Sequence, residues 1–241
     1  MGKVWFITGA GSGIGAATAR AALEAGDQVV ATGRDRGKVS EALADVTGDA
    51  LAVIRLDVTD EAAATAAVGE AVARFGRVDV LVANAGYSLL GNFEELTTAD
   101  FEALFATNFY GVAHVMRAVL PVMRAQRSGR VIVLSSSAGV VGYRHCAAYS
   151  STRFAVEGLA QAVAAEVAPF GITVAAVEPG FVRTDLLDAR NARYAPSTIA
   201  DYAAEGSAEA MWSGHHGRQA GDPAKLGRAL VAIANMEAPP A

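Results

Sequence analysis

The sequence predicts an α/β protein in which one parallel β-sheet is covered by helices on both faces. Short apolar runs alternate with longer segments of helical period, which is the pattern of repeated strand–helix–strand units. The composition is 52% hydrophobic and rich in small residues, which suits helices that cover a buried parallel sheet. The length of 241 residues is within the range of one α/β domain, so we expect a single domain over 1–241.

Six strands are expected at the short apolar runs, near residues 3–8, 28–33, 50–56, 78–83, 130–135 and 172–178. Helices fill the intervals, since apolar residues within 39–46 and within 68–75 are spaced like one face of a helix. Three further helices are expected over 97–126, from Tyr149 to Pro169-Phe170-Gly171, and from Asp222 to Asn235. The first of these carries Asn108, with Asp100 near its start.

The periodic pattern weakens after Thr184 and returns only beyond His215-His216. A long irregular insertion in a compact domain is usually a functional lid or a disordered segment. Scattered apolar and aromatic side chains in and beside it favour a substrate lid over about 183–217: Phe181, Leu186, Leu187, Tyr194, Tyr202, Met211 and Trp212.

Charge and composition argue against several classes of function. The net charge of -5 and the lack of a basic run give no reason to expect nucleic-acid binding. No apolar run reaches the length of a membrane span, and the chain enters its first strand at once, without room for a signal peptide. Cys146 is the only cysteine, so no internal disulfide is possible. We therefore expect a cytoplasmic protein without membrane or nucleic-acid partners.

A glycine-rich turn follows the first strand and opens a helix. In this context glycines let the backbone approach a pyrophosphate at the positive end of the helix. The spacing is G-x-x-x-G-x-G, and the expected cofactor-binding residues are Gly9, Ser12, Gly13, Ile14 and Gly15. The alternative is a turn with a purely structural role, and the preceding strand and following helix argue against it.

The end of the second strand bears on cofactor choice. An acidic residue at this tip accepts from a ribose 2'-hydroxyl and repels a 2'-phosphate, and Gly33 stands there instead. Arg34 follows, and its guanidinium can bind the phosphate with charge-assisted hydrogen bonds. Asp35 is contrary evidence, and both charges can also be read as solvated loop residues. We expect NADP(H) to be preferred, with NAD(H) as the alternative.

The segment from Ser136 to Arg153 predicts acid–base chemistry. A phenol has an unperturbed pKa of about 10, so Tyr149 needs a fixed positive charge nearby to act at neutral pH. Arg153 follows Tyr149 by four residues, which places both side chains on one face of a helix. Ser136 precedes Tyr149 by thirteen residues and can hydrogen-bond the same substrate oxygen, although Ser135 and Ser137 are neighbours of the same type.

These motifs resemble the short-chain dehydrogenase/reductase family in its compact form, and the resemblance covers nearly the whole chain. It implies a Rossmann-type, doubly wound sheet that binds a nicotinamide cofactor. Family members usually have a seventh strand at the end of the chain, which this sequence lacks, so we expect six. The family's Tyr-x-x-x-Lys motif reads Tyr149-Ser150-Ser151-Thr152-Arg153 here. Arginine is permanently charged and cannot be deprotonated, so the departure questions the catalytic rate more than cofactor binding.

The resemblance adds further site residues. It implies an adenine-binding pair after the third strand, Asp57 and Val58, and a cofactor-binding run after the fourth, Asn84, Ala85 and Gly86. After the sixth strand it implies Pro179, Gly180, Val182 and Thr184 near the nicotinamide, with Tyr149 and Arg153 at the ribose. It also places Asn108 in the catalytic set, through a helix distortion that holds a water. By itself, Asn108 is more often a polar residue of a buried helix.

The expected function is the reversible, NADPH-dependent reduction of a ketone or aldehyde. Tyr149 supplies the proton, Ser136 polarises the carbonyl, Arg153 holds the ribose, and Asn108 anchors a relay water. A mostly apolar substrate pocket is expected from Tyr87, Leu89, Leu90, Tyr143 and the lid aromatics. One alternative is a nicotinamide-binding sensor or scaffold with attenuated catalysis, because of Arg153. A nucleotide-sugar epimerase is a third reading, but such relatives are longer.

Cys146 and the histidine pair each have a functional and a structural interpretation. Cys146 lies near Tyr149, but a lone cysteine is usually an inert small hydrophobe. No acidic or cysteine cluster in the sequence completes a metal site around His215-His216, so no metal is expected. The resemblance further implies a homodimer or homotetramer, with the helices near 97–126 and 149–169 pairing across a two-fold axis.

Overall fold

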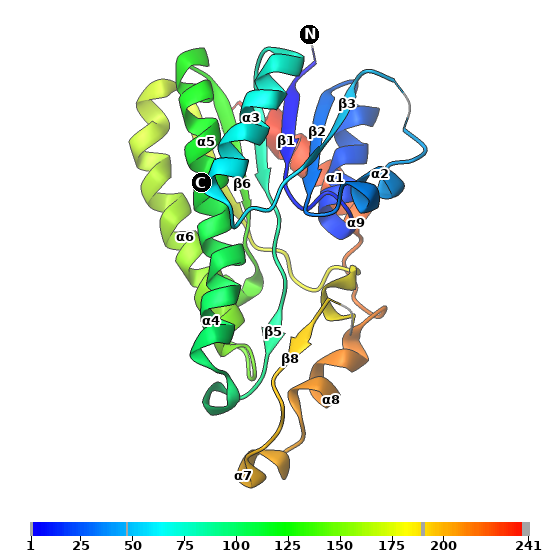
Figure 1. Ribbon diagram of the computed structural model, residues 1–241, viewed down its shortest axis with the longest axis vertical. Helices are drawn as coiled ribbons and strands as arrows, with labels where there is room; N and C mark the ends of the chain where they lie inside the picture. The colour runs from blue at the N-terminus through cyan, green and yellow to red at the C-terminus, as the bar shows by residue number, and fades with distance from the viewer. Residues whose placement is uncertain (1, 47, 189–190, 238–241) are drawn as a thin grey trace.

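The computed structural model describes residues 2–46, 48–188 and 191–237. Within them one sheet has six strands in the order β3-β2-β1-β4-β6-β7, and every pair is parallel (Figure 1). The strands are β1 (Val4–Ile7), β2 (Gln28–Gly33), β3 (Leu51–Arg55), β4 (Val80–Ala83), β6 (Gly129–Leu134) and β7 (Ile172–Val177). The predicted fold class and all six predicted strands are confirmed.

Helices cover both faces of this sheet, and the side chains of β1 show how the faces divide. Trp5 and Ile7 pack with α1 (Gly13–Glu24) and α9 (Pro223–Asn235) on one face. Phe6, between them in the strand, packs with α3 (Glu61–Phe75), α5 (Gly111–Gln126) and α6 (Ala147–Val167) on the other. The alternation follows from the two-residue period of a strand, and it creates two separate cores.

The predicted helix over 97–126 is continuous but distorted in the middle. It consists of α4 (Thr98–Phe105), a π-helical turn (Ala106–Tyr110) and α5. Thr97 and Asp100 begin it with a capping box, in which each side chain accepts from the other residue's backbone N–H. The π turn contains Asn108, so the predicted distortion at this residue is present. Such turns are frequent at functional sites.

The first and last helices of the chain pack tightly against each other. Leu230 and Ala234 of α9 join the core that contains Ala19 and Ala22 of α1. At Gly227 a Cβ atom would lie 2.6 Å from the carbonyl oxygen of Ala17, so only glycine permits this approach. The position of α1, which follows the glycine-rich turn, therefore depends on the end of the chain.

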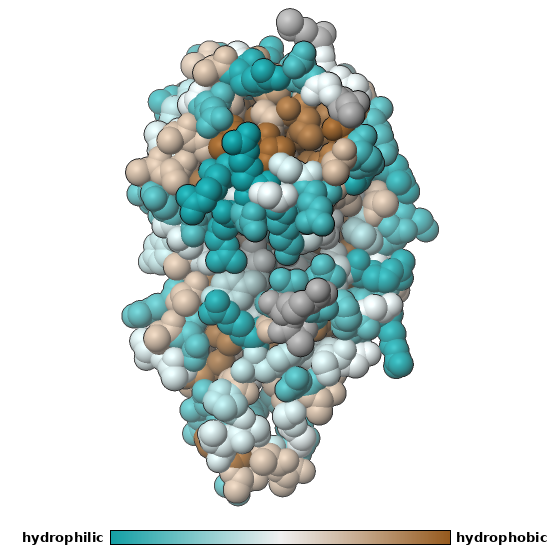
Figure 2. All heavy atoms as spheres, turned by 45° about the vertical axis from the view of Figure 1, so that its right-hand side comes forward, coloured by the Kyte–Doolittle hydropathy of each residue, from teal (hydrophilic) through white to brown (hydrophobic). Residues whose placement is uncertain are grey.

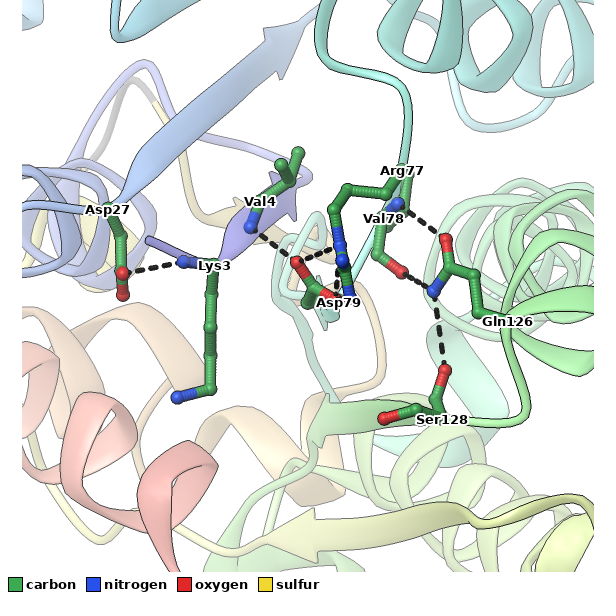
Figure 3. A network of polar contacts seen from close by, with 8 residues as sticks. All are labelled: Lys3, Val4, Asp27, Arg77, Val78, Asp79, Gln126 and Ser128. Atoms are coloured by element: carbon green, nitrogen blue, oxygen red, sulfur yellow. Dashed lines mark hydrogen bonds and ion pairs between the residues drawn. The ribbon is translucent and has the colours of Figure 1, made fainter. Parts of the chain in front are cut away.

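Polar side chains close the amino-terminal edge of the sheet (Figure 3). Asp27 accepts from the backbone N–H of Lys3 at 2.8 Å, and Asp79 accepts from that of Val4 at 2.9 Å. Gln126 accepts from the N–H of Val78 at 3.0 Å and donates to its carbonyl at 2.8 Å. These bonds satisfy backbone groups just before the strands begin, where the ladder of the sheet does not reach them.

The segment after Thr184 is ordered into short elements instead of one irregular loop. It contains β8 (Arg193–Tyr194), α7 (Ala200–Ala203) and α8 (Ala208–Trp212), and also 3-10 turns at Asp185–Leu187 and Ser213–His215. β8 pairs with β5 (Leu89–Leu90) in a parallel two-stranded sheet that the sequence did not predict. Figure 1 shows β5, β8, α7 and α8 beyond the carboxyl edge of the main sheet. We call residues 183–217 the extension.

The remaining helix is α2 (Arg36–Ala42), which is shorter than the spacing within 39–46 suggested. Figure 2 shows a mostly hydrophilic surface, with the largest group of hydrophobic residues in its upper half and smaller groups below. Among the described residues, none of the helices combines the length and apolarity needed to cross a membrane.

Candidate active site

A cleft of about 440 Å³ opens at the carboxyl ends of the strands. In open α/β sheets this is the edge at which ligands bind. Almost all of the predicted site residues line it: Gly9, Ser12, Gly13, Ile14, Arg34, Asp57, Val58, Asn84, Ala85, Gly86, Ser136, Tyr149, Arg153, Pro179, Gly180, Val182 and Thr184. Gly15 and Asn108 are the two predicted residues that do not line it, and each has a physical reason.

The glycine-rich turn is held against β4 by Asn84. Its side-chain amide donates to the carbonyls of Thr8 and Gly9, at 2.9 and 3.2 Å. A Cβ at Gly15 would lie 2.4 Å from the carbonyl oxygen of Gly9 and 2.6 Å from the Asn84 amide nitrogen. Gly15 therefore permits close packing beneath the turn, and its role as a cofactor-binding residue stays a prediction.

The turn leaves a cradle of backbone in front of α1. Gly9 and Gly13 have φ angles of 67° and 55°, which favour glycine. Ser12 is the N-cap of α1, and its side chain makes no capping hydrogen bond. The first N–H groups of this 12-residue helix are thus left without a side-chain partner at its positive end. The cradle fits the pyrophosphate of a dinucleotide.

The tip of β2 is followed by one acidic and two basic side chains, Asp35, Arg34 and Lys38. Asp35 is the N-cap of α2, where its carboxylate accepts from the N–H of Lys38 at 3.2 Å. Arg34 is exposed and lines the cleft together with Lys38. The carbonyl of Arg34 accepts from Arg55 Nε at 3.2 Å. The carboxylate of Asp35 thus caps α2, and Asp35, Arg34 and Lys38 all line the cleft at this point.

Asp57 is fixed by its own turn. Its carboxylate accepts from the backbone N–H and hydroxyl of Thr59, at 3.0 and 2.8 Å. Burial opposes ionisation, but the hydrogen bonds from Thr59 and the charges of Arg34 and Arg55 outweigh it and lower the pKa of the carboxyl. Asp57 is consequently an ionised acceptor on the cleft wall at neutral pH.

Tyr149 and Arg153 lie side by side on α6, as the four-residue spacing predicted. The guanidinium carbon is 5.0 Å from the centre of the phenol ring, and both residues are buried. Arg153 Nη1 donates to the carbonyl of Leu134 at 2.8 Å, which anchors the cation to the end of β6. Its Nη2 packs against Gly86, where a Cβ would lie 2.8 Å away. The position of the positive charge next to the phenol is therefore fixed by contacts with the end of β6 and with Gly86, which follows β4.

Ser136 follows β6 and has an extended backbone, with its hydroxyl accepting from the N–H of Ala138 at 3.1 Å. The bond from Ala138 uses only a lone pair on the Ser136 hydroxyl oxygen, so the hydroxyl proton can still be donated to another acceptor. Ser135 is 6% exposed and packs against Gly139, where a Cβ would lie 2.6 Å from its hydroxyl oxygen. Ser136 lines both the cleft and the side pocket described below, as Tyr149 does, whereas Ser135 lines only the cleft and Ser137 only the side pocket.

The side chain of Asn108 is fully buried and occupied. Its amide donates to the carbonyl of Tyr87 at 3.0 Å and to the Thr152 hydroxyl at 3.3 Å, and its oxygen accepts from the Tyr87 N–H at 3.1 Å. These bonds connect the π turn to the segment after β4 and to α6. The prediction that Asn108 anchors a relay water stays a prediction, because its side chain is turned to these partners.

A smaller pocket of about 80 Å³ adjoins the cleft on the side of the extension. Its walls are mainly apolar and come from β5, α6, the segment after β7 and the extension: Leu90, Ala138, Tyr143, Cys146, Phe181, Val182, Leu186, Leu187 and Trp212, with Ser88, Ser137, Gly180 and Gln219. Tyr149 and Ser136 line both the cleft and this pocket. The predicted apolar pocket is present, but Leu89 packs into the core beside Leu104 instead.

The thiol of Cys146 lies in this pocket wall and is 3% exposed. Burial raises its pKa to about 12. A thiolate is the reactive form of cysteine, so this residue acts as a small hydrophobe at neutral pH.

A family model described as short chain dehydrogenase matches residues 3–195. The chain belongs to this family. A 3-ketodihydrosphingosine reductase from Bacteroides thetaiotaomicron is 37% identical over 99% of this chain and 86% of its own length. A solved short-chain dehydrogenase from Streptomyces avermitilis is 39% identical, with a TM-score of 0.89 over 100% of this chain and 86% of that one.

Solved members of the short-chain dehydrogenase family contain either nicotinamide cofactor. ElxO with NADP bound has a TM-score of 0.81 and 30% identity, and covers 98% of this chain and 93% of its own. A Burkholderia phymatum member in complex with NAD has a TM-score of 0.85 and 27% identity, over 97% of this chain and 86% of that one. Membership makes this chain a nicotinamide-dependent oxidoreductase by family, without deciding between the cofactors.

Sequence reasoning missed several residues of this short-chain dehydrogenase cleft. Lys38 had a usable signal, because it follows Arg34 at helical spacing on the same tip. Arg193 had none, since it reaches the cleft through the pairing of β8 with β5 and lies over the Tyr87 ring at 4.9 Å. Gln219, which lines the side pocket and not the cleft, also had no signal, as nothing in its neighbourhood in the sequence marks a pocket.

The histidine pair has acidic neighbours that the sequence did not reveal. Ligand atoms of Asp185, Asp188 and His216 lie within 4.8 Å of one another, and His216 Nε2 is 3.5 Å from an Asp188 oxygen. The expectation that no acidic cluster lies near the histidines is therefore wrong for His216. His215 instead packs against Phe181 and Trp212.

Proposed function

We propose that this short-chain dehydrogenase reversibly reduces a ketone or aldehyde to the alcohol, with NADPH preferred over NADH. The single observation that carries the proposal is that Tyr149 and Ser136 line both the cleft and the apolar side pocket. A carbonyl compound in the side pocket thereby meets an acid and a hydrogen-bond donor at the wall that it shares with the dinucleotide cleft.

The proposed reduction uses three side chains together with a bound nicotinamide. A bound nicotinamide supplies the hydride. Tyr149 donates the proton to the carbonyl oxygen, and Ser136 hydrogen-bonds the same oxygen as negative charge develops on it. The fixed charge of Arg153 lies 5.0 Å from the phenol ring, close to the negative charge that proton transfer leaves behind.

The cofactor is held by the backbone cradle at Gly9 and Gly13, which takes the pyrophosphate. Arg34 and Lys38 take a ribose 2'-phosphate, since both line the cleft. Asp35 lines it too, with its carboxylate hydrogen-bonded as the cap of α2. This distribution of charge supports a preference for NADPH.

A panel of carbonyl compounds, each assayed with NADPH and NADH at the nicotinamide absorbance, tests the proposal. We expect turnover with at least one class of ketone or aldehyde. Tight NADPH binding without any turnover would instead support a nicotinamide-binding sensor or scaffold. That second candidate is favoured by one observation, the use of Arg153 Nη1 by the Leu134 carbonyl, which leaves fewer donors for a ribose.

We also propose that residues 183–217 act as the substrate lid, of which 189 and 190 lie outside the described residues.

We propose in addition that the protein is a homodimer or homotetramer. Aromatic side chains on the long helices support assembly, because Tyr110 is 53% exposed and Phe154 of α6 is 48% exposed. Light scattering is expected to give a mass of at least two chains. A monomer at micromolar concentration would contradict this assembly.

A further inference from the structure

Exposed apolar side chains gather around the side pocket. Among the described residues, nine large hydrophobic side chains are at least 36% exposed. Five of these nine either line the pocket or lie within two positions of a residue that does: Val140, Val141, Tyr143, Phe181 and Met211. We call these five residues the rim. They come from three separate segments of the chain that all contribute to the pocket wall, so the fold concentrates apolar surface at this place.

The two aromatic members of the rim reach from the pocket to the outer surface. Tyr143 and Phe181 line the pocket and are also 36% and 44% exposed. The Trp212 ring joins them, since it stacks on Phe181 at 5.9 Å and meets Tyr143 edge-on at 6.3 Å. Trp212 itself is 8% exposed, so a buried ring supports the two exposed ones. The apolar wall of the pocket therefore continues onto the surface of the protein.

The two arginines that lie closest to the rim in the sequence are engaged with partners in the protein. Arg144, next to Tyr143, pairs with Glu205 at 3.1 Å. Arg183, two positions beyond Phe181, donates from Nη1 to the backbone carbonyl of Gln219 at 3.0 Å. Contiguous apolar surface of this kind often marks a binding site. The chemistry of the rim therefore suits an uncharged, apolar group better than an anion.

The pocket is too small to hold more than the reacting end of a substrate. Its volume is about 80 Å³, whereas a cavity of roughly 150 Å³ is needed for one benzene ring. A carbonyl group beside Ser136 and Tyr149, with its first substituent atoms, would fill the pocket. The rest of a larger substrate has two ways out. One leads into the cleft, which the dinucleotide occupies in the proposed function, and the other leads across the rim.

We propose that the substrate is a carbonyl compound with an extended aliphatic chain, and that this chain lies along the rim. Because the pocket wall continues into the rim, such a chain contacts apolar side chains from the carbonyl to the protein surface. Contact removes apolar area of both partners from water, which is favourable in proportion to the area buried. This inference rests on the proposed function for the carbonyl and on the rim for the chain.

A series of methyl ketones with ethyl, butyl, hexyl and octyl chains tests the proposal. Binding is measured by isothermal titration calorimetry on the full chain, with and without NADP⁺, since the oxidised cofactor has no hydride to deliver. If only the pocket bound the substrate, affinity would level off after the ethyl compound. We expect affinity to keep rising to the octyl compound, by about twofold for each added methylene, as when roughly half of the surface of the group is buried.

Val141→Thr and Met211→Gln each place a polar group on the rim and keep the shape of the side chain. Each is expected to weaken binding of the octyl ketone about twofold to fivefold and to leave the ethyl ketone within about twofold. Met236→Gln is the matched control for Met211→Gln, because Met236 is 44% exposed at the end of α9 and outside the rim, and it should leave every affinity unchanged. Circular dichroism checks the fold, and Met211→Gln decides the question if Val141→Thr does not fold.

The proposal is overturned if affinity stops rising beyond the ethyl ketone, if none of the ketones binds, or if Met236→Gln has the same effect as the rim variants. It is also overturned if the rim variants leave binding of the octyl ketone unchanged, and a lower mass of these variants in light scattering would then assign the rim to contact between copies of the chain. A failure of the proposed function looks different. In that case the dependence on chain length is present in the titrations, but the protein turns over none of the ketones with either reduced cofactor.

Discussion

The two edges of the main sheet treat their polar groups in opposite ways. At the amino-terminal edge, Asp27, Asp79 and Gln126 bind the backbone groups that precede the strands (Figure 3). At the carboxyl edge, Ser135 Oγ and Arg153 Nε are buried without a hydrogen-bond partner among the described residues. Side chains thus satisfy the backbone groups at the first edge, whereas these polar atoms at the second edge stay unpaired within the described residues. Variants at the first edge should change stability, and variants at the second should change activity.

The largest effect is expected for Tyr149→Phe, which removes the proposed acid and keeps the ring. Turnover should fall at least a hundredfold, which is within the usual contribution of general acid catalysis. Thermal stability and cofactor affinity should change little, because the described structure gives the phenol oxygen no hydrogen bond to lose. Steady-state kinetics and calorimetry check both parts, and an active variant would reject Tyr149 as the acid.

At the opposite edge, Asp79→Ala should lower the free energy of unfolding by about 1–3 kcal/mol, because the buried N–H of Val4 loses its acceptor. Cofactor affinity should stay the same. Asp79→Asn, which keeps an oxygen at this position, is the control and should recover part of the loss. Urea unfolding gives the stability, and equal effects of both variants would mean that the hydrogen bond contributes little.

Arg34→Ala tests how much one cation at the carboxyl edge contributes to the choice between NADPH and NADH. Loss of one charge-assisted hydrogen bond should weaken NADPH binding about tenfold and leave NADH binding nearly unchanged. Arg36→Ala is a matched control, since Arg36 is exposed nearby but does not line the cleft. If the parent protein binds NADH as tightly as NADPH, the argument from Arg34 is wrong.

The smallest effect is expected for Arg153→Lys, which restores the residue typical of the family. A titratable ammonium replaces a guanidinium that cannot be deprotonated, so turnover at neutral pH should rise severalfold and cofactor affinity should change less. Rates from pH 6 to 9 check this. Unchanged or lower turnover would show that arginine, anchored at Leu134, is a working substitute in its own surroundings.

Local sequence rules predicted the features that depend on neighbours in the chain. The six strands follow from apolar runs, and the contact of Tyr149 with Arg153 follows from one turn of helix. The cradle follows from glycines between a strand and a helix. Each of these requires only a few consecutive residues, whose conformation is dictated by period and sterics.

Features that join distant segments could not be predicted in this way. β5 and β8 are two residues each and meet across more than a hundred positions, so neither has a detectable period. The unpartnered atoms of Trp212 and Gln219 depend on what the extension packs against. Gly15 and Asn108 were expected in the site because their motifs were recognised. In the structure Gly15 packs against the Gly9 carbonyl and Asn108 binds the Tyr87 backbone, and their predicted roles stay predictions.

The packing of α9 on α1 has a consequence for the order of synthesis. The family match ends at residue 195, but the core that supports the glycine-rich turn includes Leu230 and Ala234. A nascent chain that has emerged only to residue 195 has its dinucleotide motif complete in sequence, while the apolar face of α1 still lacks its cover. We therefore expect α1, and the turn before it, to be fully packed only once α9 has been synthesised.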